Sequence, residues 1–132
     1  MKMTYLAAIV LMLSCGVSAS RAQGPKLTAV MTEKLHHAQN IFEAVVTSDW
    51  AGLEKESAAL EQLTADPRWT VLKYPEYARH SAAFLRAVQA LRQAAADRDL
   101  DETPRAYVAV TLACIDCHRY LARVRAARLP QE

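Results

Sequence analysis

The sequence predicts an all-α protein, an antiparallel four-helix bundle, on the strength of three observations. Four segments follow one another in which apolar residues recur at helical spacing. The 132 residues include only 3 glycines, whereas alanine and leucine are abundant, a composition that favours helices. No segment shows the alternation of a strand. Because the connections are short, each apolar stripe is best buried in one antiparallel bundle.

Residues 1–22 predict a signal peptide. Lys2 is followed by an apolar run from Tyr5 to Leu13 and then by small or polar residues up to a cleavage site before Gln23. The run is shorter than the ~20 apolar residues of a transmembrane helix, so a retained anchor is the weaker alternative. We therefore expect a periplasmic protein.

Cys15 allows one more interpretation, a bacterial lipoprotein acylated at this residue. Leu13 stands one place too close to the cysteine for a good lipoprotein signal, so ordinary secretion is preferred. Removal of the signal would leave two of the three cysteines, in a mature domain of residues 23–132.

The first two predicted helices span residues 26–47 and 50–63. Ser48 or Asp49 can cap the second helix, whose ends are less sharply defined because it contains Gly52. The first helix presents a predicted inner stripe of Leu27, Met31, Leu35, Ala38, Phe42 and Val45.

A connection at residues 65–74 follows, and we expect its apolar side chains to fold over the bundle. A third helix over residues 75–97 begins with a proline in its first turn. The last helix, residues 103–127, has Thr103 as the predicted cap. Its predicted inner face consists of Tyr107, Val110, Cys114, Cys117, His118 and Leu121.

The last helix carries the sequence Cys114-Ile115-Asp116-Cys117-His118, which matches the Cys-x-x-Cys-His attachment signature of a c-type haem. On a helix these three side chains stand at i, i+3 and i+4, so two thiols and an imidazole leave one face within about one turn of ~5.4 Å. A redox disulfide or half of a zinc site is the alternative. No strand pattern or second half-site supports it, so we expect one covalent haem c per chain.

In its layout of four helices with this motif near the C-terminus, the chain resembles the class II c-type cytochromes, the cytochrome c′ family. The resemblance implies thioethers at Cys114 and Cys117 and a proximal iron ligand at His118. It also implies a distal residue from the first helix, apolar in gas-binding members and methionine in low-spin members. The chain departs from the family in having Ile115 where lysine is frequent, and Arg123 one place beyond the expected basic position.

The distal residue can be sought by geometry. In an antiparallel bundle the early turns of the first helix lie level with the late turns of the last, which pairs His118 with the region from Met31 to Leu35. We therefore expect Met31 as a second iron ligand, or Met31 and Leu35 as an apolar wall. Bis-histidine ligation through His37 is a weaker alternative, because that side chain points about a right angle from the stripe.

These features favour an electron-transfer protein over a five-coordinate haem module that binds nitric oxide or carbon monoxide. We expect no enzyme, because the first helix shows no distal acid–base residue. Without the signal the charges balance, so no nucleic-acid role is expected. Arg123, in a basic C-terminal cluster, is a candidate partner for the haem carboxylates. The expected partners are redox proteins, small gases in the alternative, or a second copy in a homodimer.

Overall fold

The computed structural model describes residues 23–128, which form four helices and no strand. The helices are α2 (Gln23–Thr47), α3 (Trp50–Leu63), α4 (Pro75–Ala96) and α5 (Glu102–Ala126). The predicted helical class is confirmed, and the predicted bounds agree to within three residues at the first helix and one at the others. The predicted signal peptide and Cys15 lie outside the described residues.

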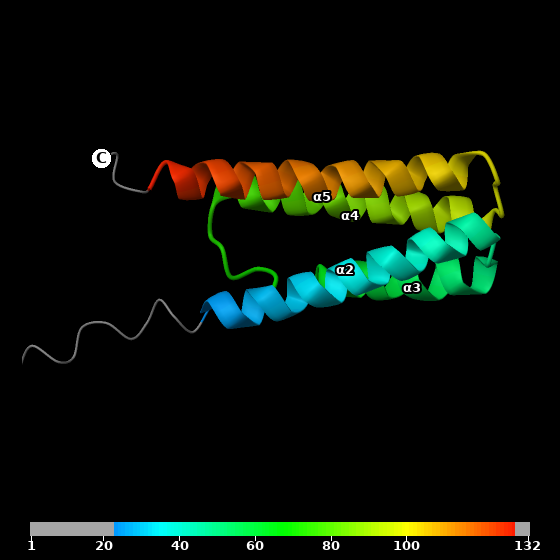
Figure 1. Ribbon diagram of the computed structural model, residues 1–132, viewed down its shortest axis with the longest axis horizontal. Coiled ribbons are helices and arrows are strands. Elements are labelled where there is room, and N and C mark those ends of the chain that lie inside the picture. The colour runs from blue at the N-terminus through cyan, green and yellow to red at the C-terminus, as the bar shows by residue number, and fades with distance from the viewer. Residues whose placement is uncertain (1–22, 129–132) are drawn as a thin grey trace, which may run out of the picture.

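The helices run alternately up and down and form two pairs, α2 with α3 and α4 with α5, which meet through α3 and α4 (Figure 1). Helices α2 and α5 touch each other little. The two pairs lie close together at the end that carries the tight turns and spread apart where α2 begins and α5 ends. In the described part of the chain, no helix has the length and apolar character needed to cross a membrane.

One core fills the bundle and is built mainly from α3 and α4. The best-buried large side chains on these two helices are Leu53, Leu60, Phe84, Val88 and Leu91. Helix α4 contributes the most core residues, α2 adds Val30, Ile41 and Ala44, and α5 adds Ala106 and Val110. The two outer helices are therefore held chiefly by their inner partners.

Local interactions define the helix ends. Asp49 caps α3 as predicted, accepting a hydrogen bond of 3.0 Å from the Gly52 amide. Thr103 does not cap α5, contrary to prediction. The helix already begins at Glu102, its first amides are bonded by the Asp99 carboxylate, and Thr103 is buried with an unpartnered hydroxyl. The Asp99 carboxylate takes the predicted role of Thr103, because it accepts hydrogen bonds from two amides, those of Asp101 and Glu102.

The connection between α3 and α4 packs on the bundle, as predicted, through Trp69. This side chain is 3% exposed and stacks on Phe84 with a ring separation of 5.4 Å. Its indole N–H donates to Ser81 over 3.0 Å, and its carbonyl accepts from the Tyr77 hydroxyl over 2.6 Å. Arg68 forms ion pairs with Asp66 of the same connection and with Glu33 of α2, and so links this segment to the first helix.

The predicted inner stripe of α2 is wrong, because the helix is rotated about its axis so that other residues face the core. Leu35 and Phe42 are 58% and 56% exposed, and the face that packs on the core carries Val30, Lys34, Ile41 and Ala44. The physical reason is that α2 packs against α3 and leaves the side facing α5 open.

A buried carboxylate joins α2 to α3. Glu56, 8% exposed, accepts hydrogen bonds from His37 over 2.7 Å and from Asn40 over 3.2 Å, and lies 3.1 Å from the Lys55 amine. The His37 hydrogen bond is the main cause that lowers the pKa of Glu56 from 4.5 to about 2, against the opposing effect of burial. The ionised carboxylate therefore stabilises the contact between these helices.

We predict that this carboxylate makes the fold acid-sensitive. Because the pKa of Glu56 is lowered on folding, its contribution is complete above pH 4.5 and is lost as the pH falls toward about 2. Glu56→Gln should reduce the unfolding free energy by about 1–2 kcal/mol at pH 7 and by little at pH 2. Urea unfolding at both pH values tests this, with the exposed Glu54→Gln as the control. Equal losses for Glu56→Gln at both pH values would contradict the assignment.

Candidate functional site

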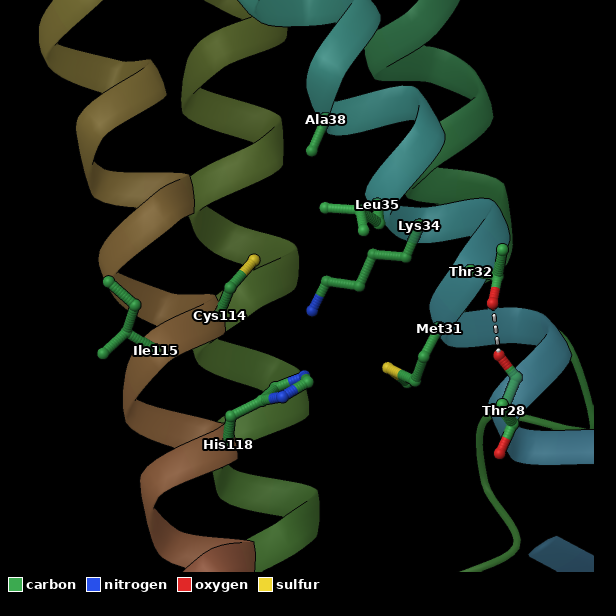
Figure 2. A pocket seen from close by; sticks show the side chains of 9 residues that line it. All are labelled: Thr28, Met31, Thr32, Lys34, Leu35, Ala38, Cys114, Ile115 and His118. Atoms are coloured by element: carbon green, nitrogen blue, oxygen red, sulfur yellow. Dashed lines mark hydrogen bonds between the residues drawn. The ribbon is translucent and has the colours of Figure 1, made fainter.

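A pocket of about 470 Å³ opens where α2 and α5 separate. Figure 2 shows side chains from both helices entering it from opposite sides. The wall on α5 consists of Cys114, Ile115 and His118, and the wall on α2 consists of Thr28, Met31, Thr32, Lys34, Leu35 and Ala38. Its size is within the usual range of ligand pockets, and its lining is mostly apolar.

The α5 wall is built from the Cys-x-x-Cys-His segment. Cys114 and Cys117 are half-buried free thiols one turn apart, and His118 follows directly, exposed at the pocket. Helical geometry brings these three groups to neighbouring positions because they are separated by three and four residues. Cys114 and His118 line the pocket, whereas Cys117 does not line it and packs against the core of the bundle.

The surroundings favour a neutral imidazole. Partial burial, with a smaller contribution from the positive charge of Lys34, lowers the pKa of His118 below its usual 6.5. Neutral imidazole is the form that binds metal ions. Burial raises the pKa of Cys117 above its usual 9.0, opposed by the same Lys34 charge. Lys34 is therefore close enough to influence the pKa of both Cys117 and His118.

The opposite wall brings the predicted distal residues into the pocket. The Met31 thioether points across the gap toward the His118 ring (Figure 2). Leu35 also lines the pocket from α2. His37 does not line it, because its ring is engaged by Glu56 on α3. The structure thus brings Met31 and Leu35 to His118 and leaves His37 elsewhere.

Tyr107 links α5 to α2 beside the pocket. Its hydroxyl donates a hydrogen bond of 3.1 Å to the Ala38 carbonyl, which links α5 directly to α2. Its ring also contacts Phe42, with centroids 6.0 Å apart. Because Ala38 lines the pocket, this link lies at the border of the pocket.

Arg123, the predicted partner of haem carboxylates, does not line this pocket. It is exposed in a separate groove between α4 and α5, together with Glu76, Arg79 and Arg119. Of the other C-terminal arginines, Arg128 reaches Tyr74 of the connection.

The cation that does line the pocket is Lys34, which the sequence analysis did not single out. It is 6% exposed and lies on the α2 row that also carries Val30 and Ile41. A lysine at i+4 on an otherwise buried apolar row is the signal that could have identified it.

The donor set fits a covalently attached haem. Two free thiols and an imidazole stand at neighbouring positions of α5, and the pocket lined by Cys114 and His118 is mostly apolar. A structural zinc site needs four ligands, and within residues 23–128 no three His, Cys, Asp or Glu side chains gather around one point.

Comparisons of the chain with protein-family models, with characterised proteins and with solved structures returned no match.

We predict that Tyr107 stabilises the contact between α2 and α5. Tyr107→Phe keeps the ring contact with Phe42 and removes only the hydrogen bond to Ala38, so it should lower the unfolding free energy by about 1 kcal/mol. Tyr74→Phe, which removes a solvent-exposed hydrogen bond with Arg128, should cost less. Urea unfolding of both variants makes the comparison, and a larger loss for Tyr74→Phe would show that the α2–α5 link is unimportant.

Proposed function

We propose that this chain is an exported c-type cytochrome that carries one covalently attached haem and transfers electrons in the periplasm. The observation that supports it best is the position of Cys114, Cys117 and His118 on one helix beside an apolar pocket between α2 and α5. A chain that used these cysteines only as a redox pair would gain nothing from a pocket of this size beside them.

Each group has a distinct role in this proposal. Cys114 and Cys117 form the thioethers, and His118 binds the iron from the α5 side. Met31, whose thioether points toward His118, is the second iron ligand. When bound, the haem supplies an iron that gains and loses one electron, and a thioether ligand raises its reduction potential.

The chain's own contribution is to orient these groups and to limit water around them. Burial and the Lys34 charge favour the neutral, iron-binding imidazole of His118 through its lowered pKa. Leu35 and Ala38 give the α2 wall an apolar surface, and Tyr107 fixes the distance between the helices at one end.

A second candidate function is the binding of nitric oxide or carbon monoxide. It is favoured by the width of the opening between α2 and α5, which leaves room beside Met31 for a small ligand. In that case Met31 and Leu35 form an apolar wall without binding the iron.

Exposed apolar side chains flank the pocket and support a docking role for this side of the molecule. They recur along both helices at helical spacing, namely Leu35, Phe42 and Val46 on α2 and Val108, Leu112 and Ile115 on α5. Apolar surface close to the haem suits a transient contact with a redox partner protein, and a homodimer through the same side is the other arrangement.

We predict that haem attachment depends on the two cysteines of α5. The chain produced with a c-type haem maturation system should keep its haem stain in denaturing electrophoresis, because thioethers survive unfolding. Cys114→Ser combined with Cys117→Ser should remove the stain, whereas Cys15→Ser should keep it. A haem that acidified organic solvent extracts from the unmutated protein would refute covalent attachment.

We predict that Met31 determines the spin state of the iron. If its thioether binds, the oxidised protein is low spin with a weak near-infrared thioether-to-iron band. Met31→Leu should then abolish the band, give a high-spin spectrum and allow carbon monoxide to bind the reduced protein. His37→Ala should leave the spectrum unchanged. An unmutated protein that is already high spin and binds carbon monoxide would select the gas-binding function, and a spectrum that collapses only in His37→Ala would establish bis-histidine ligation.

A further inference from the structure

Lys34 is a buried cation inside the pocket. Its side chain is among the least exposed on α2, at 6%, although a lysine is seldom buried without a partner. The amine lies 3.8 Å from the centre of the Phe84 ring and 4.9 Å from that of Trp69. Two aromatic faces therefore surround one side of the charge.

This environment leaves the charge incompletely compensated. In the described part of the chain no carboxylate lies within ion-pair distance of Lys34 and no acceptor is hydrogen-bonded to it, whereas Glu56 has three donors and Arg68 has two carboxylates. Cation–π contacts contribute about 2 kcal/mol when desolvated. Removing an ammonium from water costs several kcal/mol, so an anionic partner is needed to restore the balance.

The open side of the amine faces the pocket. Figure 2 shows the Lys34 side chain extending from α2 toward α5, with its nitrogen opposite Cys114 and His118. Lys34 and His118 both line this pocket, from opposite walls. A group that fills the pocket would therefore meet this ammonium on the side opposite the attachment motif.

We propose that Lys34 is the anion-binding residue of the pocket and that it holds an anionic group of the pocket's occupant. The assignment rests on the proposed haem function, which offers two sources of such a group: a carboxylate of the haem itself, or, where Met31 does not bind the iron, a small anion bound in its place. Both place negative charge against an ammonium that has no other counter-charge.

Arg123 provides the matched control. It is a cation of the same sign, but it is exposed and lines the groove with Glu76 and Arg79 on another side of α5. Lys34→Met keeps the length of the side chain without its charge, and Lys34→Arg keeps the charge. Arg123→Met removes an equal charge outside the pocket. Circular dichroism melts of the haem-free chains verify folding, and Lys34→Met should melt at the same temperature as the unmutated chain or higher, since a desolvated charge is removed.

The first arm of the test uses the haem-free full-length chain and two porphyrins without vinyl groups, mesohaemin and its dimethyl ester. If Lys34 holds a haem carboxylate, the unmutated chain should bind the free acid about tenfold or more tightly than the ester, as expected for one charge-assisted hydrogen bond. Lys34→Met should lose this preference, and Lys34→Arg and Arg123→Met should keep it. Quenching of tryptophan fluorescence gives the affinities.

The second arm titrates the oxidised holoprotein with azide. If Lys34 holds an anion bound to iron, Lys34→Met should weaken azide binding about tenfold, with no change for Arg123→Met. If Lys34→Met weakens binding in only one of the two arms, that arm identifies the source of the anion. If Lys34→Met behaves as the unmutated chain in both arms, Lys34 is not the anion-binding residue.

The two arms separate this inference from the haem proposal. A protein that stains for covalent haem but shows no effect of Lys34→Met in either arm would overturn the role of Lys34 alone. A chain that neither stains for haem nor binds mesohaemin would overturn both.

Discussion

The stacking of Trp69 on Phe84 is the contact on which the arrangement of the two helix pairs depends. It brings the connection between α3 and α4 into the space beside α2, where Lys34 lies over both rings. Arg68 then ties the same segment to Glu33 of α2. Because an indole ring occupies this space, α2 rests on the connection and on α3 at the wide end of the bundle. The opening toward α5 is thus a result of how the core is filled.

The helices themselves could be predicted closely, since their ends carry local signals. Asp49 caps α3, and Pro75 stands in the first turn of α4, where its missing N–H costs nothing. The inward face of α2 could not be predicted in the same way. Its apolar residues form two overlapping rows, one through Val30 and Ile41 and one through Leu35 and Phe42, and only the choice of α3 as the packing partner decides between them.

Some features of the candidate site could likewise be predicted from the sequence, and others could not. The positions of Cys114, Cys117 and His118 relative to one another follow from helical spacing alone, and the level of Met31 follows from antiparallel packing. Arg123 is five residues beyond His118, about 500° of helical rotation, so it emerges from another side of α5. Lys34 was not singled out, because a charged residue is normally assigned to the surface, although its position on the buried row with Val30 and Ile41 could have indicated its burial.

The open contact between α2 and α5 also bears on how the chain folds. Every extensive helix contact joins elements that are consecutive in sequence, and the pair most distant in sequence is the one that scarcely touches. Contacts between sequence neighbours close short loops, which makes folding fast and independent of the chain's far end. The bundle can therefore form before its first and last helices are joined. Apart from the Tyr107 hydrogen bond, little holds these two helices together. Under the proposed function, a ligand that bound both walls would complete their contact, so that its capture and the last step of folding would become one event.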